Sequence, residues 1–281
     1  MRLRVPPPRG RSRGAAHGGT QQRYTCHVSS RDAWQRRLGP LYGGAVALVH
    51  STPWRWPAEV AEDRLAAGWM VALGLPIGAA AWAAAALCHA AGLPSSIAAL
   101  VGLAALSVAS AALVERGLTE RVDHWERQAD RDPAPPADPR ARSPGVAAIL
   151  VLVFVTLVRA AAIVALPPSR WLAVLVATAV IGRWSAMVLQ ALGEPIIDGD
   201  PRRSLVAAPA PAWLVGAISA GVLALTIFTV GKAGILALAF AAIAAFALGL
   251  QAQRRDGALS GPAVAVAAAA GELAILLVAT L

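Results

Sequence analysis

Charged residues and cysteines are scarce in this sequence of 281 residues. Asp, Glu, Lys and Arg make up 15% of the chain, whereas soluble domains contain about 25%, which argues against a soluble fold. Only two cysteines occur, Cys26 in a polar stretch and Cys88 in an apolar one. They exclude a disulfide framework and a cysteine-based zinc site. The histidines show no H-x-x-x-H spacing, so they do not indicate a metal site either.

The net charge of +9 comes almost entirely from the N-terminal tail. Residues 1–37 hold nine Arg and one Asp, and the remainder holds 16 basic and 15 acidic residues. A nucleic-acid-binding protein needs a basic folded part, so no nucleic-acid partner is expected. The tail is rich in Arg, Gly and Pro, and no apolar signal-peptide core follows it. We expect residues 1–37 to be a disordered cytoplasmic tail, with a loose contact to anionic lipid as the alternative.

The rest of the chain is strongly apolar. Hydrophobic residues make up 57% of the sequence, and its mean hydropathy is +0.58. A membrane crossing needs about 20 apolar residues, and seven stretches are long enough: 68–91, 93–114, 145–166, 170–192, 212–230, 233–250 and 262–281. We therefore predict an all-α, polytopic membrane helical bundle over residues 38–281, in which small residues such as Gly74 and Gly78 let helices approach closely. The shorter run 38–50 predicts a re-entrant or interfacial helix.

The distribution of Lys and Arg predicts the orientation, because these residues favour cytoplasmic connections. With the N-terminus inside, the inside segments are 1–67, 115–144, 193–211 and 251–261, and they hold 21 of the 25 basic residues. We therefore expect an inner-membrane protein whose N-terminus and polar loops face the cytoplasm. The inside loop 115–144 is also the acidic one, with seven Asp and Glu residues.

Three charged residues fall within predicted spans: Arg159, Arg183 and Glu272. Such residues are costly in a bilayer and mark either a functional path or a buried pair. Two interpretations stay open here, a substrate-facing role or a structural ion pair of Glu272 with one of the arginines.

A group of carboxylates begins where the second predicted span ends. If the helix continues, Glu120 and Asp123 share a face at spacing i, i+3, with Glu115 five residues earlier. Carboxylates beside a membrane suit Mg²⁺, which takes one or two acidic ligands and substrate phosphate oxygens. The alternative is a solvated helix end whose acids pair with Arg116, Arg121 and Arg127.

Several loop sequences carry a family resemblance. Residues 114–124 read VERGLTERVDH, residues 138–145 read DPRARSPG, and residues 256–262 read DGALSGP. Together with Gly182-Arg183-Trp184 between the second and third of them and Glu272 after the third, they resemble in order the cobalamin-5'-phosphate synthase family, also called adenosylcobinamide-GDP ribazoletransferase. The resemblance covers about residues 38–281. In the acidic signature, Gly117, Leu118 and Asp123 match, Glu120 replaces an Asp, and Arg116 stands where the family has an Asp.

The resemblance implies an activity and a set of residues for it. In this family α-ribazole, or its 5'-phosphate, attacks adenosylcobinamide-GDP and GMP leaves. The resemblance implies Mg²⁺ as cofactor, held by Glu115, Glu120, Asp123 and Asp138. It gives catalytic roles to Asp123, Arg140 and Arg183, and substrate-binding roles to Arg159, Ser143, Ser260 and Glu272. The implied partners are the corrinoid-nucleotide and ribazole substrates and the lipid bilayer. A homo-oligomer and an association with other cobalamin-pathway proteins are left open.

Other functions compete with this one. The departures from the family signatures favour a catalytically impaired paralogue that acts as a membrane scaffold or corrinoid-binding partner. A CDP-alcohol phosphotransferase needs the pattern D-G-x-x-A-R-x8-G-x3-D-x3-D, in which Asp130 stands where a Gly is required. A transporter with Arg and Glu along its path is a further alternative.

Overall fold

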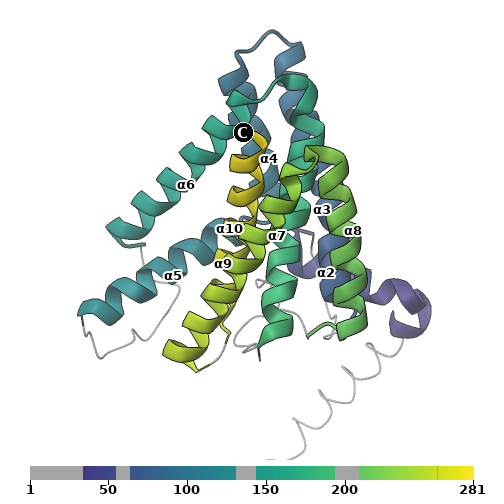
Figure 1. The fold of residues 1–281 in the computed structure, drawn as a ribbon, viewed down its shortest axis with the longest axis vertical. Helices are drawn as coiled ribbons and strands as arrows, with labels where there is room; N and C mark the ends of the chain where they lie inside the picture. The colour runs from purple at the N-terminus through teal and green to yellow at the C-terminus, as the bar shows by residue number, and fades with distance from the viewer. Residues whose placement is uncertain (1–33, 55–63, 131–143, 194–208, 258) are drawn as a thin grey trace, which may run out of the picture. The chain divides into compact units, whose positions relative to one another are not determined.

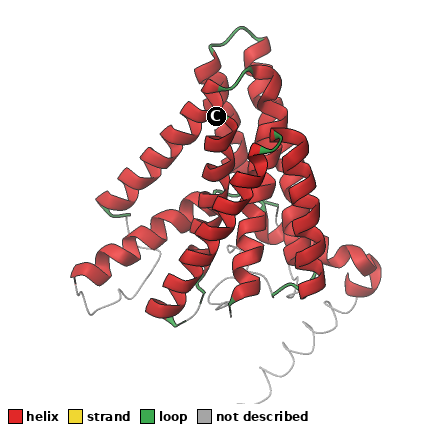
Figure 2. Cartoon of the chain, viewed as in Figure 1, coloured by secondary structure: helices red, strands yellow, loops and turns green. Residues whose placement is uncertain are grey.

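A computed structural model of the protein describes residues 34–54, 64–130, 144–193, 209–257 and 259–281, of which Pro40–Leu281 belong to one compact unit. Every regular element in the described part is helical, and it contains no strand (Figure 2). The all-α prediction is confirmed. The helices are α2 (Tyr42–Ser51), α3 (Ala66–Ala90), α4 (Ser95–Ala109), α5 (Leu113–Asp130), α6 (Val146–Ala165), α7 (Trp171–Leu192), α8 (Ala212–Val230), α9 (Ala233–Asp256) and α10 (Gly261–Ala279), with single 3-10 turns at Gly39–Leu41 and Pro168–Arg170.

Six helices in the described part are long and apolar enough to cross a membrane: α3, α6, α7 with the preceding turn, α8, α9 and α10. Their ends lie within a few residues of the predicted ones, except that α9 continues to Asp256. The predicted span 93–114 differs, because α4 ends at Ala109 and α5 leaves it at an angle of 82°. The described part therefore contains six helices that could span a membrane, or seven candidate spans if this bent pair counts as one. The predicted short run 38–50 forms α2, which packs on α3.

Helices α7 and α10 are the most buried of the apolar helices and position the rest of the bundle. Helix α7 contacts α3, α8, α9 and α10, and α10 also contacts α5 and α6. Two glycines allow α3 to reach α7: a Cβ on Gly74 would lie 2.8 Å from Val180 Cα, and one on Gly78 would lie 2.5 Å from Val176 Cα. The prediction that Gly74 and Gly78 mediate helix contact is confirmed, and backbone meets backbone as in other membrane bundles.

The outward faces of α6, α8 and α9 are apolar. Phe154, Phe228 and Phe240 are large examples, with Phe228 91% exposed. An apolar surface of this extent fits contact with lipid tails rather than water. In Figure 1 the connections α3–α4, α6–α7 and α8–α9 lie toward the upper end, and the α9–α10 connection lies toward the lower end. This alternation agrees with helices that cross a bilayer in succession.

Candidate active site

The candidate site is centred on the bend between α4 and α5. Helix α4 ends at Ala109 with Ser110 as its C-cap, and the next two residues, Ala111 and Ala112, have φ values of 53° and 50°. This left-handed conformation is unfavourable for residues with a side chain, so surrounding contacts must hold it. Two of them are made by serines: Ser107 donates a hydrogen bond to Glu115 across the bend at 2.6 Å, and Ser110 accepts one from Arg183.

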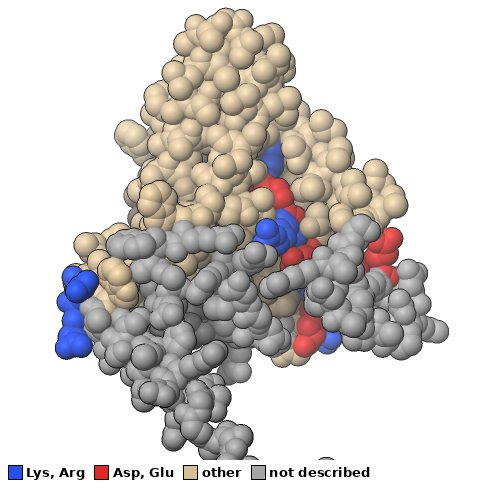
Figure 3. All heavy atoms as spheres, turned by 180° about the vertical axis from the view of Figure 1, so that it is seen from behind, with Lys and Arg blue, Asp and Glu red and all other residues tan. Residues whose placement is uncertain are grey.

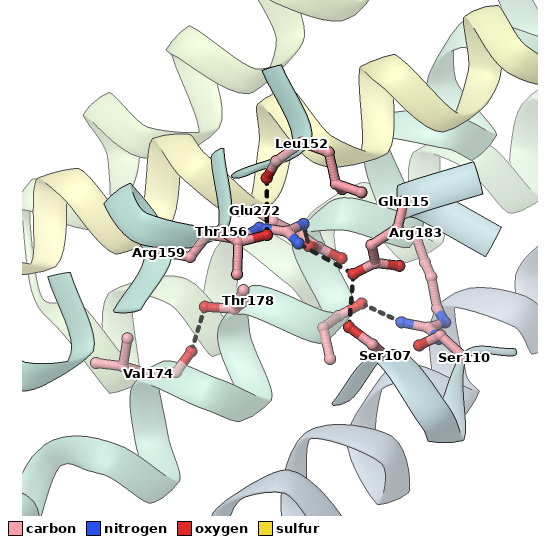
Figure 4. Close-up of polar contacts among 11 residues, drawn as sticks. Ser107, Ser110, Glu115, Leu152, Thr156, Arg159, Val174, Thr178, Arg183 and Glu272 are labelled. Atoms are coloured by element: carbon pink, nitrogen blue, oxygen red, sulfur yellow. Dashed lines mark hydrogen bonds and ion pairs between the residues drawn. The ribbon is translucent and has the colours of Figure 1, made fainter. Parts of the chain in front are cut away.

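A buried ion pair joins α6 and α10. The guanidinium of Arg159 on α6 pairs with the carboxylate of Glu272 on α10, and its Nη1 lies 3.3 Å from Glu115 Oε1. Glu272 fits beside α7 because residue 182 is glycine: a Cβ there would lie 2.6 Å from Glu272 Cγ. The predicted ion pair between Glu272 and one of the arginines is therefore present, and its arginine is Arg159. The pair lies in a larger group of charged side chains (Figure 4).

Arg183 on α7 belongs to the same group but has no direct carboxylate partner. Its Nη2 donates to Ser110 Oγ at 2.8 Å and its Nη1 donates to the Ala179 carbonyl at 3.0 Å. Its buried Nε has no hydrogen-bond partner in the part of the chain that the structure describes, and neither has Nε of Arg159. Figure 4 shows Glu115 lying between the Arg159 and Arg183 side chains. We call the set Ser107, Ser110, Glu115, Arg159, Arg183 and Glu272 the buried network.

A second set of carboxylates lies further along α5. Asp123 accepts a hydrogen bond from the backbone N–H of Gly145 at 2.8 Å, just before α6 begins. A Cβ on Gly145 would lie 2.4 Å from Glu126 Oε2 and 3.0 Å from Asp123 Oδ1, so glycine lets both acids approach this helix end. Their charges are favourable there because of the helix dipole. Glu120 interacts electrostatically with Asp123 and with Arg116.

These acids bear on the predicted Mg²⁺ site. Glu115 and Asp123 are eight residues apart on one helix, roughly 12 Å at 1.5 Å per residue, so they do not meet at one ion. In the described ranges, no three His, Cys, Asp or Glu side chains are close enough to hold a metal together. Mg²⁺ is commonly bound by one or two carboxylates with substrate phosphates, and Glu120 with Asp123 fits that arrangement.

A further ion pair ties α5 to the end of α9. Arg121 pairs with Asp256, and His124 Nε2 lies 3.4 Å from the same carboxylate. The guanidinium of Arg121 also lies 5.3 Å from the centre of the Trp125 ring. We call Arg121, His124 and Asp256 the α5–α9 tie. It holds α5 against the end of α9.

Of the remaining predicted residues, the structure describes Ser260, which lies away from the buried network. Ser260 precedes α10 as its N-cap residue, twelve residues and roughly 18 Å along the helix from Glu272. Asp138, Arg140 and Ser143 lie outside the described residues. Sequence reasoning missed Ser107 and Ser110, although two serines three residues apart at the end of an apolar run are a usable signal. It also missed the pairing of Arg121 with Asp256, for which the sequence offers no signal.

Some acidic and basic side chains are visible on the face turned away from the viewer in Figure 1. They show in a recess of that face, and the surface at its top is free of charged side chains (Figure 3). Such an uncharged surface agrees with a bilayer-embedded protein, because charges facing lipid are costly.

The fold and the buried charges define a polytopic integral membrane protein of the helical-bundle class. The chain matches the family model described as cobalamin-5-phosphate synthase (CobS) over residues 45–280. It belongs to this family, whose members are transferases of cobalamin synthesis, and the predicted resemblance is confirmed. No curated protein and no solved structure matches the chain.

Proposed function

We propose that the protein is an adenosylcobinamide-GDP ribazoletransferase of the inner membrane, which joins α-ribazole or its 5'-phosphate to adenosylcobinamide-GDP with release of GMP. The family match over residues 45–280 carries this proposal. The arrangement of charges supports it, because transfer at a diphosphate needs positive groups near the phosphate oxygens. The family match gives no support to a CDP-alcohol phosphotransferase.

In the proposed reaction Arg183 binds a non-bridging oxygen of the diphosphate. Its buried Nε has no partner in the described structure, and a guanidinium suits a pair of phosphate oxygens. Arg140, by the family resemblance, adds a second positive charge. Arg159 and Glu272 stay paired and line the substrate position. Ser143 and Ser260 keep their proposed substrate contacts through their hydroxyl groups.

The carboxylates Glu120 and Asp123, with Asp138, are the residues that would hold Mg²⁺. Bound there, the cation supplies neutralisation of charge on the phosphate oxygens. Asp123 also accepts the proton of the attacking ribazole hydroxyl, which needs a carboxylate within hydrogen-bond reach of that hydroxyl. No side chain of the protein has to act as the nucleophile.

The direct test is GMP release. Membranes that contain the protein, supplied with Mg²⁺, adenosylcobinamide-GDP and α-ribazole, should form adenosylcobalamin and GMP, and a chelator should stop the reaction until Mg²⁺ is restored. Parallel reactions with α-ribazole 5'-phosphate identify the preferred acceptor. Asp123→Asn should abolish product formation, and retained activity would contradict the role given to Asp123.

A catalytically impaired scaffold is the second candidate function. Arg116, where the family has Asp, is exposed beside Glu120, which favours it. No GMP above blank membranes, together with retained corrinoid binding, would support the scaffold. In that case Arg116→Asp should raise activity if the charge reversal alone impairs the site. Accumulation of unchanged labelled substrate in vesicles would instead support transport.

The proposed orientation places the N-terminus and the polar loops in the cytoplasm. It follows from the excess of Lys and Arg in those segments. Cysteines introduced at Arg254 and at Lys232 should differ in labelling by a membrane-impermeant maleimide added to intact cells. We expect label at position 232 only, and the reverse pattern would contradict this orientation.

A further inference from the structure

The two arginines of the buried network are paired unequally. Arg159 contacts the carboxylates of both Glu115 and Glu272, whereas Arg183 donates hydrogen bonds only to a serine hydroxyl and a backbone carbonyl. Both arginines are buried, with 4% and 5% of their surfaces exposed. A buried charge needs a counter-ion nearby, because its desolvation is otherwise uncompensated. For Arg183, the carboxylate that lies beside its side chain in Figure 4 is that of Glu115.

Glu115 has one oxygen in use and one without a partner. Its Oε1 accepts hydrogen bonds from Ser107 and Arg159, at 2.6 Å and 3.3 Å. Among the described residues, its buried Oε2 has no hydrogen-bond partner, and the same is true of Arg183 Nε and Arg159 Nε. An unsatisfied acceptor therefore lies beside unsatisfied donors on groups of opposite charge. Groups left in this state are exceptions in folded proteins and point to a ligand or a role in function.

We propose that Glu115 is the shared counter-ion of Arg159 and Arg183, and that it positions Arg183 for an anionic phosphate group of the substrate. This inference rests on the proposed function. Ser107, on the other side of the bend, donates a hydrogen bond to the Glu115 carboxylate. The Glu115 side chain therefore connects the bend with the two arginines. Glu115 is then a positioning residue and not a ligand of the divalent cation. The separation of roughly 12 Å along α5 between Glu115 and Asp123 supports this division of roles.

The proposal has a specific kinetic signature. A glutamine at position 115 keeps an oxygen that accepts the Ser107 hydrogen bond but carries no charge. The substrate phosphate then no longer competes with a carboxylate for Arg183, so KM for adenosylcobinamide-GDP should fall several-fold. The guanidinium is no longer held in place, so kcat should fall by about tenfold to a hundredfold, as misplaced groups do. The Mg²⁺ concentration for half-maximal rate should stay unchanged.

These quantities are measured by GMP release for the wild type, Glu115→Gln, Glu115→Asp and Asp256→Asn. Glu115→Asp restores the charge and should return KM toward the wild-type value. Asp256→Asn is the matched control. It also removes the charge of a carboxylate that pairs with an arginine, but Asp256 belongs to the α5–α9 tie and lies outside the proposed site. It should lower the melting temperature and leave both KM and the Mg²⁺ requirement unchanged. A raised Mg²⁺ requirement in Glu115→Gln, or a fall in kcat with unchanged KM, would overturn the proposal.

A thermal unfolding cycle decides the pairing even if the wild type releases no GMP and the proposed function fails. The purified protein in detergent is compared with Glu115→Gln, Arg183→Met and the double variant. Glu115→Gln leaves Arg183 without its counter-ion, and Arg183→Met leaves Glu115 with Arg159 alone, so both should lower the melting temperature. The double variant should be more stable than the sum of the two losses predicts, because it leaves neither charge alone. Additive losses would show that Glu115 is not the counter-ion of Arg183.

Discussion

Helix α5 takes part in two groups of charges that are built differently. In the α5–α9 tie, one arginine meets one aspartate, and His124 at the edge is 43% exposed in its side chain. In the buried network, two arginines and two glutamates come from α5, α6, α7 and α10, and the direct ion pairs all fall on Arg159. The tie satisfies its own charges, whereas the network leaves donors and acceptors unused. The difference agrees with the proposal that the buried network binds a ligand, whereas the tie needs none to satisfy its charges.

The largest expected effect is a difference in activity between a variant of Arg183, in the buried network, and a variant of Arg121, in the α5–α9 tie. Arg183→Met should reduce kcat/KM for GMP release by about a hundredfold or more, as the loss of a group that stabilises transition-state charge does. Arg121→Met removes an equally buried arginine from the tie and should leave the activity of correctly folded protein within a few-fold of wild type. Rates are normalised to folded protein by size-exclusion chromatography. Equal losses would erase the distinction between the two groups.

The next effect concerns stability. Glu272→Gln leaves Arg159 with its longer contact to Glu115 alone, and breaking a buried pair in this way costs about 3–5 kcal/mol. Asp256→Asn should cost less than half as much, because Asp256 is partly exposed and water compensates the change. Unfolding of the two variants in detergent measures both losses. A larger loss for Asp256→Asn would contradict the view that the network is the more deeply buried of the two.

A smaller effect tests how closely α7 approaches the network. Gly182→Ala places a methyl group against Glu272 Cγ, and overpacking of this kind costs about 1–3 kcal/mol. Gly221→Ala on α8 is the matched control, since no atom lies within 4 Å of a Cβ there. It should be neutral or stabilising, because alanine favours a helix by about 1 kcal/mol over glycine. The melting temperature of Gly182→Ala should therefore fall, and that of Gly221→Ala should stay the same or rise. An equal fall in both variants would contradict the close approach of α7 to Glu272.

The smallest effect sharpens the role of the bend. Glycine adopts positive φ without strain, so Ala111→Gly should relieve the local conformation. The gain is offset by the greater freedom of the unfolded chain, and we expect a net increase in stability of up to about 1 kcal/mol. Kinetic parameters should stay unchanged, because the contacts of Ser107 and Ser110 are retained. A loss of stability would show that the bend is not strained at Ala111.

The sequence allowed the helices to be predicted closely, because long apolar runs bounded by polar segments leave few alternatives. The bend at Ser110 was not predicted, since Ser110, Ala111 and Ala112 include neither proline nor glycine. Because the bend was not predicted, the position of Glu115 in the site was not predicted either. Glu115 was grouped with Glu120 and Asp123 by sequence distance, but tertiary contacts direct it toward Arg159. The Glu272–arginine pair was foreseen as one interpretation, because an acid and a base in apolar spans have few other partners.

The glycine contacts of α3 with α7 have a mechanical consequence. Where backbones touch at Gly74 and Gly78, neither helix can slide without a steric clash or a void, so α3 and α7 act as one rigid frame. Arg183 lies on α7, which is part of that frame, whereas Arg159 lies on α6. The outward face of α6 is largely apolar. If the proposed function holds, any widening that admits the substrate should therefore come from displacement of α6, and crosslinking α6 to α4 should block GMP release while leaving Arg183 undisturbed.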